Sequence, residues 1–134
     1  MILLLDIDRT SNRLYPPTAR SIRDLAPQEL RGTNGQPFWD WATAHLSKVV
    51  YPPHEEAFNV LRLLSAHASG VFVNTGRPEA LRAVSERWLR RHLNVDRIWM
   101  RASDDFRMTT EVKLSNLTEL LRFHPSAEIY AFLR

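Results

Sequence analysis

Short apolar segments alternate along this chain with longer stretches of helical periodicity, and this alternation restricts the possible folds more than any other feature. The apolar segments lie at 2–8, 71–73, 98–100 and 128–133. We predict that each is a strand, because they are too short and too continuously apolar for surface helices. Strands separated by helices form βαβ units, so the predicted fold class is α/β with a mostly parallel sheet.

Helices are expected over about 54–70, from Pro78 onward and around 114–121. Two prolines precede the first helix and Gly70 ends it, while Pro78 suits the first position of the second. Residues 74–77 are expected to form the turn before that second helix. The residues expected to face the core are Ala57, Val60, Leu61, Leu64, Ala68, Leu81, Val84, Trp88, Leu114, Leu117 and Leu121.

The segment 11–53 differs from the rest of the chain, because it contains six of the eight prolines. We predict a loop-rich insertion after the first strand, with one short helix at 38–48. Aromatic residues in such a segment pack over the core or over a ligand cleft. Trp39 and Trp41 are therefore expected to pack, with stacking on nucleic-acid bases as the alternative.

Length and composition exclude several classes of protein. A chain of 134 residues suits one domain, and the absence of cysteine excludes disulfides, thiolate metal sites and a cysteine nucleophile. The apolar runs, such as that at 2–5, are too short for a signal peptide or a membrane span, so we expect a cytoplasmic protein with no membrane partner. The sequence carries no signal for the oligomeric state.

Arginines crowd the segment that follows the second predicted strand, although the net charge of the chain is only +3. Such a cluster could attract phosphates or nucleic acid, or it could be the solvated face of a helix. The residues concerned are Arg77, Arg82, Arg87, Arg90 and Arg91.

Polar clusters follow the predicted strands. Asp6 and Asp8 follow the first strand, residues 74–77 follow the second, and Lys113 begins a later helix. Because the carboxyl ends of parallel strands meet at one edge of the sheet, where such sheets bind ligands, we expect these clusters to lie together.

Together these residue types suit phosphoryl transfer. One carboxylate can attack phosphorus and a second can move the proton. A hydroxyl and main-chain N–H groups can hold phosphate oxygens, a lysine can neutralise charge, and Mg²⁺ can reduce the repulsion between the carboxylate and the phosphate. Each residue also has a simpler interpretation: Asp6 and Asp8 as turn caps, Thr75 as a helix cap, and Lys113 as a surface lysine.

The order of these residues resembles the haloacid dehalogenase superfamily of phosphohydrolases. Its first motif, an apolar strand followed by Asp-x-Asp-x-Thr, is similar to residues 3–10, which end in Thr10. Its second motif, a strand followed by Ser or Thr, is similar to 71–75, and its motif lysine to Lys113. The resemblance implies one domain over 1–134, a three-layer Rossmann-like α/β fold, and a small cap insertion at about 11–53.

The resemblance also implies roles for four residues. Asp6 would be the nucleophile, Asp8 the general acid and base, Thr75 the phosphate-binding hydroxyl and Lys113 the neutralising cation. Mg²⁺ would be the cofactor, held by Asp6 and by the main-chain carbonyl of Asp8.

A closer likeness is to the 3′-phosphatase domain of polynucleotide kinase-phosphatases. It involves the run Thr75-Gly76-Arg77 and the run from Arg101 through Arg107 to Lys113. It implies a phosphatase acting on phosphorylated nucleic-acid ends in repair; the alternatives are a phosphatase of nucleotides or small metabolites, and an inactive binding domain. Substrate contacts are then expected from Thr10, Asn74, Gly76, Arg77, Arg101 and Arg107.

Two departures from the superfamily pattern stand out. Arg9 occupies the position that is usually glycine after the second aspartate. The fourth motif, one or two metal-binding acids just after the last strand, is expected where the chain ends at Arg134. We therefore expect either that the natural protein continues past Arg134 or that the metal site lacks an acid. Asp105, with Arg107 beside it, lies in another loop and could form a simple salt bridge.

Overall fold

Four parallel strands form one sheet in the order β3-β2-β1-β4. The computed structural model describes residues 1–125 and 128–132. The strands are β1 (Ile2–Leu5), β2 (Gly70–Pro78), β3 (Arg97–Arg101) and β4 (Ile129–Phe132). β1 and β2 lie inside the sheet, and their apolar residues are buried on both faces, as is typical of parallel sheets. The prediction of an α/β fold with a parallel sheet is confirmed.

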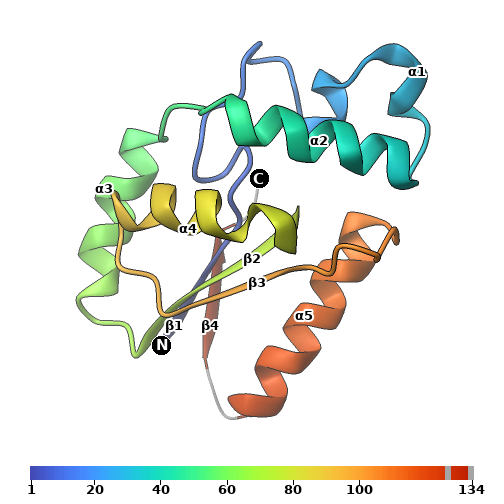
Figure 1. Cartoon of the computed structure of the whole chain (residues 1–134). Helices are drawn as coiled ribbons and strands as arrows, with labels where there is room; N and C mark the ends of the chain where they lie inside the picture. Colours follow the sequence, from blue (N-terminus) through green and yellow to red (C-terminus); the bar gives the residue numbers. More distant parts are fainter. Residues whose placement is uncertain (126–127, 133–134) are drawn as a thin grey trace.

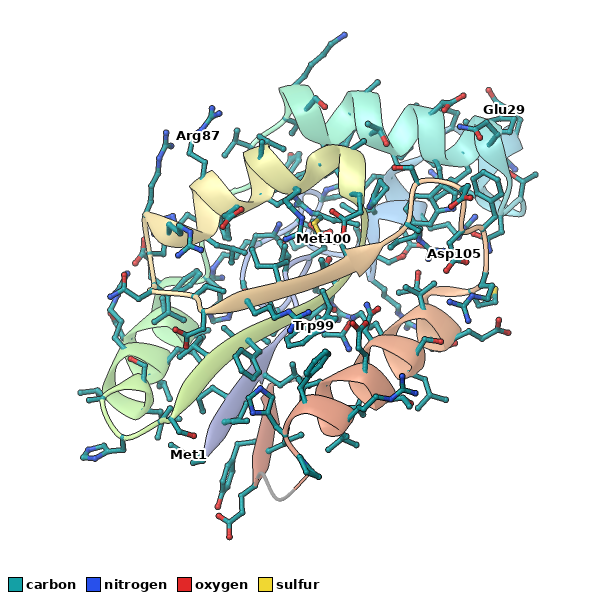
Figure 2. The ribbon with its side chains drawn as sticks, turned by 60° about the horizontal axis from the view of Figure 1, so that its bottom comes forward. Met1, Glu29, Arg87, Trp99, Met100 and Asp105 are labelled. Atoms are coloured by element: carbon teal, nitrogen blue, oxygen red, sulfur yellow. The ribbon has the colours of Figure 1, made fainter. Side chains whose placement is uncertain are left out.

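Helices cover both faces of the sheet (Figure 1). They are α3 (Glu55–Ser65) and α4 (Arg82–Arg90) on one face, and α5 (Thr109–Phe123) on the other. Alternate residues of a strand point to opposite faces, so Leu3 packs with the α3 and α4 side and Leu4 with α5. Figure 2 shows the same alternation at Trp99, which lies toward α5, and Met100, which lies toward α4. These three layers are compatible with a Rossmann-like fold.

The 11–53 segment contains a 3₁₀ turn, η1 (Ile22–Leu25), and the helices α1 (Gln28–Arg31) and α2 (Gln36–Lys48). The predicted helix at 38–48 is confirmed as α2, which begins two residues earlier. Part of the segment has its own small apolar cluster, formed by Ala26, Phe38 and Ala42. Leu46, near the end of α2, joins the main core instead. In Figure 1, α2 lies across the upper end of the molecule, beyond the carboxyl ends of β1 and β2.

The prediction of a turn at 74–77 is wrong, because β2 continues to Pro78. Asn74 pairs with Trp99 and Pro78 with Arg101, so the register between β2 and β3 shifts across these residues. Such a bulge keeps the chain extended while it redirects the side chains. Pro78 has an extended backbone, and a 3₁₀ turn, η2 (Glu79–Leu81), separates it from α4.

The first strand ends at Leu5, earlier than predicted. Ile7 is buried in the core, but the chain has already turned, since the N–H groups of Ser11 and Asn12 both donate to the Ile7 carbonyl, at 2.9 and 3.1 Å. A helical turn therefore carries Asp8 away from the strand axis. This turn separates the two carboxylates, which would lie on one face of a continued strand.

Two helices are rotated relative to the prediction. In α3, which ends at Ser65 and not near Gly70, Phe58 is fully buried, whereas Val60 is half exposed. In α5, Val112 and Leu120 are buried, whereas the exposed residues include Leu114 and Leu121. Polar contacts between α5 and β2, described below, set the rotation of this helix. The spacing of its apolar residues gives no indication of these contacts.

The last strand was predicted to span 128–133 and is observed as β4. The expected position of a fourth motif, after Phe132, lies outside the described residues. Within the described part of the chain, none of the helices combines the length and the apolar character needed to cross a membrane.

Candidate functional site

A cavity of about 330 Å³ lies at the carboxyl ends of β1 and β2. One side is formed by the strand ends and the beginning of α5, and the other by the 11–53 segment. Six of the residues predicted for the site line this cavity together: Asp6, Asp8, Thr75, Gly76, Arg77 and Lys113.

Asp6 and Lys113 form an ion pair in the cavity. The Asp6 Oδ2 contacts the Lys113 ammonium, and its Oδ1 accepts the Ile7 N–H at 2.8 Å. Burial raises the pKa of the Asp6 carboxyl, Lys113 opposes the rise, and the negative charge of Asp8 adds to it. Lys113 therefore offsets part of the cost of a negative charge in a place that disfavours it.

The pKa of Asp6 gives a testable expectation. In the intact protein its carboxyl is expected to titrate above the ordinary value of 3.8, and Lys113→Met is expected to raise the midpoint further, because the opposing positive charge is lost. Since a raised pKa makes ionisation unfavourable for the fold, the unfolding free energy of Lys113→Met should fall as the pH rises through that midpoint. Carbon NMR of the Asp6 carboxyl measures both midpoints. A midpoint at or below 3.8 in the intact protein, or one lowered in the variant, would contradict this.

Asp8 is held by a two-point contact with Arg77. Arg77 Nη2 donates to Oδ1 at 2.6 Å and Nε to Oδ2 at 3.0 Å, the fork geometry of strong guanidinium–carboxylate pairs. Asn12 Nδ2 also donates to Oδ1, at 2.9 Å, and Arg77 Nη1 donates to Ser85 Oγ at 3.0 Å. Both oxygens of Asp8 are therefore occupied by donors from the protein.

Thr75 is 1% exposed, and its Oγ1 accepts the Arg77 N–H at 3.1 Å. Its hydroxyl proton donates to no acceptor within the described part of the chain, so it is available to a phosphate oxygen. Gly76 lies next to it, where a Cβ would come within 2.7 Å of Thr109 Cγ2. The absence of a side chain at Gly76 therefore lets β2 approach the start of α5.

Asn74 lies behind the cavity and does not line it. Its Nδ2 donates to the Lys113 carbonyl at 3.0 Å, and its Oδ1 accepts from Asn116 Nδ2 at 2.9 Å. Both partners are in α5, so Asn74 fixes the rotation of this helix and the position of Lys113. We therefore assign it a positioning role in place of the predicted substrate contact.

Arg101 and Arg107 are also placed outside the cavity lining. Arg101 is 1% exposed, and its guanidinium donates to protein acceptors: the carbonyls of Gly76, Asp105 and Arg107, and Thr109 Oγ1. Arg107 pairs with Asp105, and its hydrogen bonds lower the pKa of that carboxyl to about 2. Thr10 lies in the turn after Asp8, outside the lining. The salt-bridge interpretation of Asp105 and Arg107 agrees with these contacts.

The remaining arginines of the predicted cluster lie on α4 or, for Arg91, directly after it. Arg82 pairs with Glu79 and Arg90 with Glu86, both at 2.7 Å, and Arg87 points away from the sheet in Figure 2. This agrees with a solvated helix face. The tryptophans of the 11–53 segment pack, as expected: Trp41 stacks on a histidine ring, and Trp39 lies against the Arg101 guanidinium and also lines the cavity.

Sequence reasoning missed several residues of the site. Asn12 and Ser85 hold Asp8 and Arg77, and Arg9 and Arg20 line the cavity. The four-residue spacing between Asp8 and Asn12 is that of a helical turn and could have indicated their contact. No comparable signal marks Ser85 or Arg20, since packing between distant segments sets the contact of Ser85 with Arg77 and brings Arg20 to the cavity.

The donor set is compatible with Mg²⁺. The residues at 1–125 and 128–132 contain no group of three or more metal-ligating side chains. Mg²⁺, however, often needs only one or two protein carboxylates, with water and substrate phosphate completing its shell. The main-chain carbonyl of Asp8 accepts no hydrogen bond from the described residues, and with the Asp6 carboxylate it offers two oxygen ligands.

Comparisons of this chain with protein-family models, with curated protein sequences and with solved structures found no match. Assignment of a function therefore depends on the chemistry of the cavity.

Proposed function

We propose that this protein is a phosphomonoesterase that acts through an aspartyl phosphate on Asp6. One observation carries the proposal: Asp6, with Lys113 paired to it, shares a single cavity with Asp8 and Thr75. These residues come from three separate parts of the chain. Each supplies something that phosphoryl transfer requires: Asp6 a nucleophile, Asp8 a proton carrier, Thr75 a hydrogen-bond donor to phosphate, and Lys113 a neutralising cation.

The reaction proceeds in two displacements. Asp8, released from Arg77, first takes a proton from the entering phosphate or from solvent. An Asp6 oxygen attacks phosphorus, the bond from phosphorus to the ester oxygen breaks, and the departing oxygen takes that proton from Asp8. Water then attacks the phosphorus of the aspartyl phosphate and gives a proton to Asp8. The bond to Asp6 breaks, inorganic phosphate leaves, and Asp8 loses its proton to solvent and pairs with Arg77 again.

Arg77 links substrate binding to the proton carrier. In the free protein its guanidinium occupies both oxygens of Asp8. An entering phosphate dianion competes for the same guanidinium and would release Asp8 to exchange a proton with the leaving group. Thr75 and Lys113 would bind further phosphate oxygens. Mg²⁺, held by the Asp6 carboxylate and the Asp8 carbonyl, would offset the negative charge where nucleophile and phosphate meet.

Phosphorylated nucleic-acid ends, specifically 3′-phosphates, are the proposed substrate class. Two features support this: the cavity has more cationic than anionic side chains, and Trp39 supplies an aromatic surface beside it. The 11–53 segment would act as a cap over the bound end. A nucleotide or small metabolite is the alternative substrate for the same chemistry.

A binding domain without catalysis is the second candidate function. It is favoured by the cation contacts that engage both carboxylates, Lys113 on Asp6 and Arg77 on Asp8. In this case the cavity would bind phosphate ends without cleaving them.

Phosphate release tests the two candidates. With Mg²⁺, the protein is expected to release phosphate from a 3′-phosphorylated oligonucleotide, and EDTA is expected to stop the release. A nucleoside 3′-monophosphate as the faster substrate would favour the small-molecule alternative. Binding of the phosphorylated oligonucleotide with no turnover at any Mg²⁺ concentration would favour the binding domain and reject the enzyme.

A further inference from the structure

Five cationic side chains line the cavity, and three of them are already occupied. Arg77 is paired with Asp8 and Lys113 with Asp6. The guanidinium of Arg23 donates to the carbonyls of Arg31 and Thr33 and to Asn34 Oδ1, and it lies 3.9 Å from the centre of the Phe38 ring. Arg23 therefore serves to hold the 11–53 segment together.

Arg9 and Arg20 are the other two cationic side chains that line the cavity. Neither side chain has an acidic or hydrogen-bonding partner among residues 1–125 and 128–132, although both line the cavity. Arg9 follows Asp8 directly, while Arg20 comes from the 11–53 segment. Two unpaired positive charges therefore reach one cavity from two different parts of the chain.

The backbone of Arg9 gives a second, independent observation. Its φ is +69°, in the left-handed region that glycine enters more easily than any residue with a side chain. Asn12, 2% exposed, accepts the Arg9 N–H at 2.7 Å and holds this conformation. An unfavourable backbone conformation kept in place by a buried partner is typical of functional sites. Glycine would fit this backbone better, so the backbone conformation does not account for an arginine at this position.

We propose that Arg9 and Arg20 bind a second phosphate group of the substrate, next to the phosphate that Asp6 attacks. The inference rests on the proposed function and names which substrates the site prefers. Once the pairs at Asp6 and Asp8 are formed, the uncompensated charge of the cavity is positive, so a second anion is favoured over a neutral group. That anion is either a second phosphomonoester on the same nucleoside or the phosphodiester that joins it to the next nucleotide.

Binding in a background that does not consume the ligand tests the inference. In an Asp6→Asn protein, dissociation constants are measured by calorimetry for a nucleoside 3′-monophosphate, a nucleoside 3′,5′-bisphosphate and a 3′-phosphorylated dinucleotide. At low salt, at least one of the two ligands that carry a second phosphate group is expected to bind about 10- to 100-fold more tightly than the monophosphate, the range for charged hydrogen bonds. Tighter binding of the bisphosphate would identify the second group as a phosphomonoester, and tighter binding of the dinucleotide would identify it as a phosphodiester.

Arg20→Gln and Arg9→Gln are each expected to reduce this preference by about tenfold. The matched control is Arg13→Gln, which removes an exposed arginine of the same segment that does not line the cavity and is expected to leave the preference unchanged. A preference below about threefold before either arginine is changed, or an equal loss in the Arg13 control, would overturn the inference.

Arg9→Gly separates a binding role from a structural one. It removes the guanidinium and supplies the residue best suited to a φ of +69°, so the melting temperature is expected to stay the same or rise while the preference falls. A lower melting temperature with the preference intact would mean that Arg9 is structural and would overturn its assignment. If the intact protein hydrolyses none of the three ligands, the proposed function fails, and the binding ratios still decide the second-phosphate site.

Discussion

Asp6→Asn is expected to abolish phosphate release, lowering kcat by at least about 10⁴-fold, as removal of a covalent nucleophile does in other hydrolases. The reason is the loss of the negative charge of the Asp6 side chain. Asparagine keeps the size of the side chain and the acceptor for the Ile7 N–H, but it has no negative charge with which to attack phosphorus. The change therefore removes the chemistry with little change in shape.

A release assay with the phosphorylated oligonucleotide measures this effect. Asp104→Asn is the matched control, since Asp104 is an exposed aspartate outside the cavity lining and its loss is expected to leave turnover intact. Circular dichroism must show that the Asp6 variant is folded. Turnover within about 100-fold of the unchanged protein would rule out Asp6 as the nucleophile.

Arg101→Met is expected to lower the free energy of unfolding by about 3 kcal/mol or more, because the change removes a buried guanidinium and several main-chain acceptors lose their donor at once. The Arg101 guanidinium is the common donor to the Gly76, Asp105 and Arg107 carbonyls, at 3.1, 2.9 and 2.6 Å. These carbonyls belong to the end of β2 and to the loop before α5. Arg101 therefore joins two of the segments that form the cavity.

Urea unfolding at a fixed temperature measures the change. Arg87→Met removes an exposed arginine and is expected to stay within about 0.5 kcal/mol of the unchanged protein. Arg101→Lys keeps the charge but lacks the several N–H donors of a guanidinium. Its loss of unfolding free energy is therefore expected to lie between those of Arg87→Met and Arg101→Met. A loss below about 1 kcal/mol in Arg101→Met would show that water replaces the guanidinium at these carbonyls.

The layers of the fold could be predicted because they depend on local signals. Apolar runs and their spacing identified the parallel strands and the helices between them. The continuation of β2 through 74–77 and the buried face of α5 could not be predicted, because both depend on contacts between distant segments. The register of β2 against β3 determines the first, and the hydrogen bonds of Asn74 to α5 determine the second.

The candidate site divides in the same way. Asp6, Thr75 and Lys113 could be predicted to meet, because parallel strands bring their carboxyl ends to one edge. Arg101 was predicted to contact substrate, since nothing in its sequence position shows that its partners are main-chain carbonyls of a neighbouring loop. Arg20 escaped prediction for the same reason, because tertiary contacts bring it to the cavity, whereas the contact of Asn12 with Asp8 is local and could have been inferred from their spacing.

The separate apolar cluster around Phe38 has a consequence for how the cavity opens. Asp6 and Thr75 are attached to the two interior strands, whose exposure to solvent requires the whole sheet to come apart. The cluster of Ala26, Phe38 and Ala42 is small and distinct from the main core. We therefore expect the part of the 11–53 segment that packs around this cluster to open at a lower free energy than global unfolding. The two walls of the cavity therefore belong to units of unequal local stability, and amide hydrogens of η1 and of the first turns of α2 should exchange faster than those of β1. A ligand too large for the closed cavity can enter by partial opening of this segment while the reacting groups keep their positions.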